Sequence, residues 1–106
     1  MTAGSGRIRP VILEHAVLPV RPGLEASFEA AFARARPLLE ATPGFRTLRL
    51  ERSVESPSTY LLLVEWDSVE AHTEGFRGSD RYGPWREFLH HFYDPFPVVE
   101  HFRSVE

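Results

Sequence analysis

Residues 66–101 hold most of the side chains that could carry chemistry, including both tryptophans and four of the five histidines. Imidazole changes its charge near neutral pH and therefore suits a general base, while phenolic hydroxyl and guanidinium groups stabilise anions by hydrogen bonding. A pocket of aromatic rings with a few such polar groups would bind a small aromatic molecule. The candidate catalytic residues are His72, Tyr82, Arg86 and His101. The candidate substrate-binding residues are Trp66, Phe76 and Trp85.

The aromatic residues near the end of this region also have a simpler interpretation. Phe88, Leu89 and Phe92 recur at helical spacing, which is typical of a helix that packs against a core. Tyr82 and Trp85 fit a core and a pocket equally well, because a buried hydroxyl or indole N–H needs a partner in either place. The pocket therefore depends on whether these side chains converge in space.

The histidines do not form a strong metal-binding motif. Glu87, His90 and His91 stand at i, i+3 and i+4, so the carboxylate shares a helix face with each imidazole and could bind a divalent cation. Two adjacent histidines point about 100° apart on a helix, however. We therefore predict no metal site.

Two histidines lie in segments that we expect to be strands, and their orientation stays open. His15 follows Glu14, and His101 follows Glu100. Because neighbouring side chains of a strand point to opposite faces, only one member of each pair can face the helices. The sequence does not determine which member does so.

The composition argues against several classes of protein. The net charge is −3, from 12 basic and 15 acidic residues that are mixed along the chain, so we expect no nucleic-acid partner. Cysteine is absent, which excludes cysteine-ligated metal centres and fits a cytoplasmic protein. No apolar stretch is long enough for a membrane span or a signal peptide, so no membrane partner is expected. Because motifs typical of nucleotide and flavin sites are also absent, we expect no cofactor.

Apolar periodicity predicts the elements that must position the candidate residues. Strands are expected at 11–18, 45–54, 59–66 and 98–105, and helices at 24–41, 68–77 and 82–92. We expect Pro37 to bend or weaken the end of the first helix, and Asp67 or Ser68 to cap the second. Residues 1–9 are predicted to be a flexible tail, and residues 10–106 a single domain. The order of elements is typical of an α+β, ferredoxin-like fold, with a four-stranded antiparallel sheet and helices on one face.

One predicted strand is apolar on both of its faces. Its residues 60–64 read Tyr-Leu-Leu-Leu-Val, so side chains on either side of the sheet should avoid water. The helices can cover only one face of a four-stranded sheet, and a second copy packed sheet to sheet is the simplest cover for the other. We therefore expect a homodimer. The alternative, a monomer with an apolar surface, would invite aggregation.

Several short motifs follow the order and spacing of a known family. They are a helix that starts at Gly23, the sequence Pro43-Gly44-Phe45 at the entry to the second strand, and Val64-Glu65-Trp66-Asp67-Ser68 followed by Ala71-His72 and Ser79. In these motifs the chain resembles the antibiotic-biosynthesis monooxygenase family over about residues 10–105. The resemblance implies a dimeric α+β barrel. Known branches of that family include cofactor-free oxygenases of polycyclic aromatic phenols, haem-degrading enzymes and small members with no settled activity.

The haem-degrading branch differs from this chain at the positions of its catalytic and iron-ligating residues. By this resemblance, its first-strand asparagine, its tryptophan and its iron-ligating histidine fall on Ala16, Phe76 (or Gly75) and Arg86 (or Trp85). Arginine stays protonated and cannot ligate iron, and alanine offers no hydrogen bond to a bound ligand. Haem breakdown is therefore the least favoured activity.

The resemblance thus predicts a small monooxygenase that oxidises a small aromatic phenol or quinol without a cofactor. A deprotonated phenol can itself pass an electron to dioxygen, so the protein needs only a dry pocket, a proton acceptor and donors that stabilise the anion. The alternative is a non-catalytic dimeric module for small-molecule binding or stress response, with a collapsed apolar core in place of the pocket. A ligand-sized cavity favours the oxygenase over that module.

Overall fold

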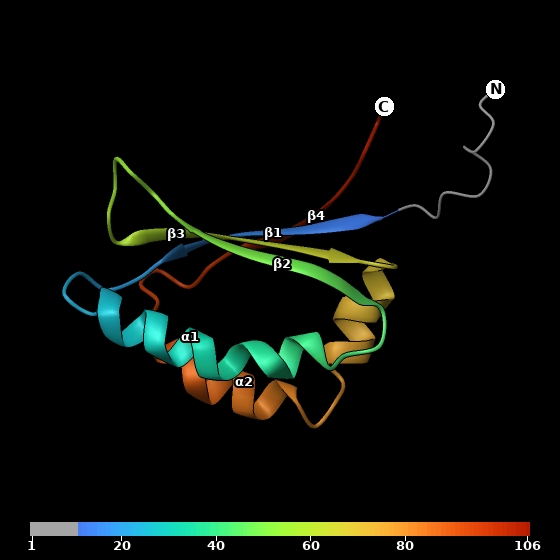
Figure 1. The fold of residues 1–106 in the computed structure, drawn as a ribbon, viewed down its shortest axis with the longest axis horizontal. Coiled ribbons are helices and arrows are strands. Elements are labelled where there is room, and N and C mark those ends of the chain that lie inside the picture. Colours follow the sequence, from blue (N-terminus) through green and yellow to red (C-terminus); the bar gives the residue numbers. More distant parts are fainter. Residues whose placement is uncertain (1–10) are drawn as a thin grey trace.

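The strands form one antiparallel sheet in the order β2-β3-β1-β4. The computed structural model describes residues 11–106, so the tail predicted for residues 1–9 lies outside the described residues. The strands are β1 Ile12–Pro19, β2 Phe45–Arg52, β3 Thr59–Trp66 and β4 Val99–Arg103. The helical elements are α1 Glu25–Glu40, η2 Ala71–Phe76, α2 Tyr82–Leu89 and η3 His90–Phe92. Both α1 and α2 lie on one side of the sheet (Figure 1), which confirms the predicted α+β, ferredoxin-like fold.

Strand alternation places the core between the sheet and the helices. In β3, every second side chain is buried, and these residues are Tyr60, Leu62, Val64 and Trp66. The buried face of α1 consists of Phe28, Phe32, Ala35 and Leu39, whose spacings of four, three and four residues match the helical repeat. Pro37 lies inside α1 near its end. The two sets of side chains belong to one hydrophobic core.

Gly44 permits a close approach between the start of β2 and the helix that follows β3. Its φ angle is +91°, and a Cβ atom there would lie 2.6 Å from the Cβ of Ala71. The Gly44 carbonyl also accepts a hydrogen bond from the N–H of Asp67 at 2.8 Å. The Pro43-Gly44-Phe45 motif is therefore needed to seat η2 beside the sheet.

The helix predicted at residues 68–77 is wound differently from the expectation. Its first turn is capped by Ser68, whose Oγ accepts the N–H of Ala71 at 3.0 Å, but η2 is a π-helix. The N–H of Arg77 accordingly donates to the carbonyl of His72, five residues back, at 3.1 Å. Both His72 and Phe76 are buried. Spacing alone does not distinguish these two windings here, since the four-residue spacing of the buried His72 and Phe76 fits both.

Three other predicted elements end two or three residues earlier than expected. α2 ends at Leu89 and continues as the 3₁₀ turn η3. β2 ends at Arg52, because the hairpin turn begins at Ser53, and β4 spans only Val99–Arg103. These segments are at element ends, where a pattern fixes the register less firmly than in the middle.

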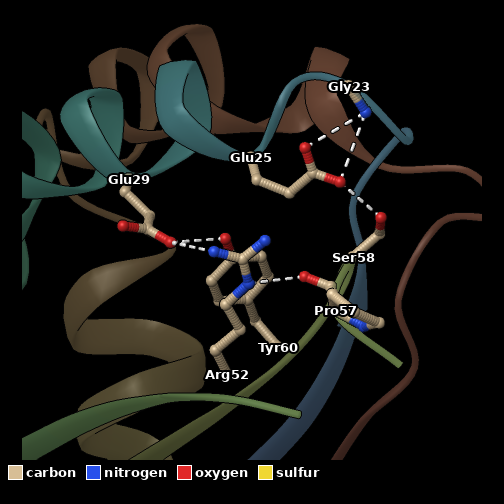
Figure 2. Close-up of polar contacts among 7 residues, drawn as sticks. All are labelled: Gly23, Glu25, Glu29, Arg52, Pro57, Ser58 and Tyr60. Atoms are coloured by element: carbon tan, nitrogen blue, oxygen red, sulfur yellow. Dashed lines mark hydrogen bonds and ion pairs between the residues drawn. The ribbon is translucent and has the colours of Figure 1, made fainter. Parts of the chain in front are cut away.

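The β2–β3 hairpin is held against the start of α1 by polar contacts (Figure 2). The Tyr60 hydroxyl donates to Oε2 of Glu29 at 2.6 Å, and the guanidinium of Arg52 lies 3.4 Å from the same oxygen. The Ser58 hydroxyl donates to the carboxylate of Glu25. The hairpin ends of β2 and β3 are thus tied to the first turns of α1.

The other face of the sheet carries neither helix (Figure 1). Its apolar side chains are Leu13, Val17, Leu61, Leu63 and Phe102, which we call the open-face cluster. Val17 and Phe102 are 45% and 47% exposed, and the three leucines are half-buried. β3 is therefore apolar on both faces, as its sequence predicts. Among residues 11–106, the helices are too short or too polar to span a bilayer.

Candidate functional site

A cavity of about 80 Å³ lies between the helix-facing side of the sheet and the helical elements. Its aromatic walls are Phe76, Tyr82, Trp85, Tyr93 and Phe96. Its polar lining residues are Glu14, His72, Arg77 and His90. The ring of Phe96 is 61% exposed, so this wall also faces solvent. The cavity is thus a small aromatic site with a few polar groups, closed on one side by a single surface ring.

Glu14 places a buried carboxyl group in the wall of the cavity. The alternation of β1 turns it to the helix side, where only 5% of the residue is exposed. Its Oε1 accepts a hydrogen bond from Nε1 of the fully buried Trp66 at 2.9 Å. The same oxygen lies 3.4 Å from Nε2 of His72.

His72 continues this contact to the neighbouring strand. Its Nδ1 lies 2.8 Å from Nε2 of His101, which β4 places directly beside Glu14 in the sheet register. A neutral imidazole has one N–H and one bare nitrogen, so one ring donates and the other accepts. We call these three residues the Glu14 cluster. It leads from the cavity wall to a histidine that is half-exposed.

Burial shifts the pKa values of the inner groups of the Glu14 cluster in favour of their uncharged forms. It raises the pKa of Glu14 to about 7, although the hydrogen bond from Trp66 and the charge of Arg77 act in the opposite direction. Burial also lowers the pKa of His72 to about 3, helped by the charges of Arg77 and His101. The pKa of His101 is lowered by burial and by Arg77. Above about pH 7 the cluster can therefore accept a proton.

Comparison with known proteins identifies the family. The sequence profile of the antibiotic biosynthesis monooxygenase family matches residues 11–87, which include the first three strands and most of the cavity walls. The chain belongs to this family. The uncharacterized protein YczJ of Bacillus subtilis is 48% identical over 95 residues, which is 90% of this chain and all of that protein.

Solved structures of similar proteins share the fold. A candidate antibiotic biosynthesis monooxygenase from Bordetella bronchiseptica has 38% identity and a TM-score of 0.86 over 92% of this chain and 99% of its own. A variant of SnoaB, a cofactor-independent oxygenase from Streptomyces nogalater, has 20% identity and a TM-score of 0.76 over 93% of this chain and 96% of its own. At that identity the second similarity concerns the fold alone. The resemblance to the antibiotic biosynthesis monooxygenase family expected from the sequence is thus confirmed.

In this member of the antibiotic biosynthesis monooxygenase family, most of the candidate site residues come together. Four of them line the cavity, namely His72, Phe76, Tyr82 and Trp85. The other two are one contact away, because Trp66 donates to Glu14 and His101 meets His72. Helix spacing brings the first group inward, and the two strands position the second.

Arg86 is the candidate residue that the structure places elsewhere. Its side chain is exposed on α2 and does not line the cavity; its Cζ atom lies 5.7 Å from the ring centroid of Tyr82. The arginine that lines the cavity is Arg77, just after η2. Arg77 could not be selected from the sequence, since an α-helical spacing through residues 68–77 gives no sign of the π winding.

Glu14 is the other functional residue that sequence reasoning did not select. Both faces of β1 are equally apolar, with Glu14 as the polar residue of one face and His15 of the other. The pattern therefore leaves the choice of face open. The pairing of Glu14 with His101 and of His15 with Glu100 resolves it, because Glu14 and His101 share the helix side.

The cavity residues do not fit haem or a metal ion. Within residues 11–106, no group of three or more histidine or acidic side chains is arranged to hold a metal. His90 lines the cavity, whereas the adjacent His91 does not. A cavity of about 80 Å³ is also far too small to hold haem. Both nitrogens of His72 face other polar atoms, so this ring is not a free iron ligand.

Proposed function

We propose that this chain is a cofactor-independent monooxygenase that oxidises a small aromatic phenol or quinol. The observation that carries the proposal is the convergence of a buried, titratable Glu14 and an uncharged His72 on an aromatic cavity. Strongly shifted pKa values in an enclosed site are typical of groups that transfer protons. Membership of the antibiotic biosynthesis monooxygenase family supports the reaction class.

The reaction needs a proton acceptor and dioxygen. The Glu14 cluster takes the phenolic proton, and the phenolate passes one electron to dioxygen. The resulting superoxide and phenoxyl radical combine through a new carbon–oxygen bond at a ring C–H position, and the peroxide anion takes back the proton to give a hydroperoxide. Loss of water from this hydroperoxide leaves a quinone, so that one oxygen atom enters the product and the other leaves as water. The substrate supplies all four electrons, and the chain supplies only proton transfer and an enclosed site.

Two hydrogen-bond donors in the cavity suit the anionic stages. Tyr82 and Trp85 line it, and within residues 11–106 neither the Tyr82 hydroxyl nor the Trp85 indole N–H has a hydrogen-bonding partner. Buried or half-buried donors without partners are uncommon in a packed core. They are available to a substrate oxygen, which favours the pocket interpretation of these residues.

The cavity volume limits the size of the substrate. An apolar cavity of roughly 150 Å³ is known to take up benzene, so the present volume of about 80 Å³ suits one ring only after a small movement of a wall. Phe96 is the wall able to move, because its ring is largely exposed. One-ring phenols are therefore the expected substrates.

The same volume is the observation that favours the alternative function. If Phe96 does not move, the space is too small for turnover, and the protein is a non-catalytic binding module. The two functions differ in whether oxygen is consumed, so oxygen uptake separates them.

The test is oxygen uptake with phenol and hydroquinone, corrected for their uncatalysed oxidation. We expect turnover whose kcat/KM rises with pH through about 7, because the accepting carboxylate forms as Glu14 loses its proton. The variant Glu14→Gln should lower kcat at least tenfold, because it removes the proton acceptor and general-base catalysis contributes roughly 10²- to 10⁴-fold. The control is Glu87→Gln, on an exposed glutamate outside the cavity. Binding without oxygen uptake by the native protein would instead establish the binding module.

We further propose that the functional unit is a homodimer joined through the open-face cluster. The cluster is a contiguous apolar surface on the two central strands and β4, and no helix covers it. A second copy packed on this face would complete the α+β barrel expected for the family, and would remove five apolar side chains from water.

A further inference from the structure

Arg77 stands at the rim of the cavity without a partner for its charge. It lines the cavity and yet is exposed, so its side chain borders both the cavity and solvent. Its backbone N–H bonds to the carbonyl of His72, which fixes the base of the side chain relative to the Glu14 cluster. Within residues 11–106, the guanidinium makes neither a side-chain hydrogen bond nor an ion pair.

Ion pairs with carboxylates at 2.7–3.4 Å occupy five of the ten arginines in residues 11–106, namely Arg21, Arg36, Arg46, Arg49 and Arg52. Arg77 is among the five without such a pair, and of these it is the one that lines the cavity. The guanidinium is positioned to receive an anion from outside the chain.

Arg77 is also the source of positive charge in the site. Of the lining residues in the described part of the chain, it is the one with a permanent positive charge, because burial lowers the pKa values of both His72 and His90. Its charge reaches the interior, where it lowers the pKa of Glu14. The protein as a whole has a net charge of −3, so its overall field does not attract anions and a local cation is required.

We propose that Arg77 binds the carboxylate of the substrate, and that the preferred ligands of this cavity are hydroxylated aromatic acids. This inference rests on the proposed function and names its substrate class. The ring of such a molecule lies against Phe76 and Trp85, whose rings meet edge to face at 5.5 Å. Its carboxylate stays at the rim beside Arg77, where it keeps part of its hydration. Its hydroxyl points to the carboxyl of Glu14, the proton acceptor of the Glu14 cluster.

The two ends of the site are electrostatically compatible with such a ligand. Burying a carboxylate in a dry cavity would cost a large amount of free energy. The rim is solvated, however, and Arg77 offers two parallel N–H donors there. Below about pH 7 Glu14 is protonated and does not repel the ligand anion. A neutral amide of the same shape loses the charge interaction and keeps the ring contacts.

The experiment compares calorimetric binding of 4-hydroxybenzoate and 4-hydroxybenzamide at pH 6. We expect the native protein to prefer the acid by about fivefold, as for one partly solvated ion pair. Arg77→Gln should abolish this preference while amide binding stays unchanged, and Arg77→Lys should keep part of it. Arg86→Gln, which removes the exposed arginine outside the cavity, is the matched control and should keep the full preference. Salt at 1 M should reduce the preference of the native protein, because it screens exposed charges.

Three results would overturn the inference. The first is equal binding of the acid and the amide by the native protein. The second is a preference for the acid that persists in Arg77→Gln. The third is an equal loss of affinity for both ligands in Arg77→Gln, because the residue then only shapes the rim. If neither ligand binds, both the inference and the ligand role of the cavity fail. If the acid is preferred through Arg77 but oxygen uptake is absent, the inference stands and the proposed oxygenase fails. Circular dichroism of each variant checks that the fold is retained.

Discussion

Glu14 shows how one side chain can couple a candidate site to stability. Its pKa is about 7 in the folded protein against 4.5 without burial, so the folded state binds an extra proton between these values. The contribution to stability from the protonated carboxyl is present below pH 4.5 and is lost as the pH rises through about 7. Replacing the carboxyl by an uncharged group removes this loss.

We therefore predict that the stability of Glu14→Gln, relative to that of the native protein, is greater at high pH than at low pH. The amide oxygen can still accept the hydrogen bond from Trp66. Between pH 5 and pH 8, the free energy of unfolding of the variant relative to the native protein should increase by about 2 kcal/mol. Urea titrations at the two pH values measure this difference. Glu87→Gln, on an exposed glutamate of α2, should show no such change, and a pH-independent difference for Glu14→Gln would contradict the raised pKa.

At the scale of single residues, the sequence indicates which side chains are candidates for the site better than it indicates their partners. His72, Tyr82 and Trp85 could be selected because their chemistry and helical spacing are visible in the sequence. Glu14 could not, since both faces of β1 have the same apolar content and only pairing with β4 decides between them. Arg77 follows a segment that forms a π-helix, and the sequence gives no sign that this winding brings it to the cavity.

At the scale of elements, the contact between the β2–β3 hairpin and α1 is open to a direct test (Figure 2). Tyr60 is 2% exposed, and its hydroxyl donates to Glu29, whose side chain is 48% exposed. Tyr60→Phe removes this hydrogen bond and leaves the carboxylate free to bind water. We predict that the free energy of unfolding falls by about 1 kcal/mol in urea titrations.

A double-mutant cycle separates this bond from changes in packing. Glu29→Ala alone should cost a similar amount, and Tyr60→Phe should have little further effect in its presence. If Tyr60→Phe is equally destabilising in both backgrounds, the hydroxyl bond does not hold the hairpin to α1. The strands themselves were predictable from alternation, and β3 matches its predicted bounds of 59–66. The side-chain contacts between elements were not predictable, because no local sequence pattern indicates which turn of α1 contacts the hairpin.

For the whole molecule, the apolar pattern of β3 predicts an assembly of more than one folded chain. The topology β2-β3-β1-β4 covers one face of β3 and leaves Leu61 and Leu63 on the other. The sequence could therefore predict that this face needs a cover, since the helices suffice for one side only. It could not give the positions of the charges around that face, because these depend on strand pairing.

Leu63→Glu tests whether a second copy provides the cover. Leu63 lies in the open-face cluster, paired in register with His15 of β1, near the centre of the sheet. In a symmetric dimer, the substitution places one carboxylate from each copy in an apolar interface, which costs several kcal/mol. We predict that sedimentation gives twice the chain mass for the native protein and a folded monomer for Leu63→Glu. Val54→Glu, on a side chain that is 89% exposed in the hairpin turn, should remain dimeric. A native protein that sediments as a monomer at all concentrations would show that this face meets something other than its own copy.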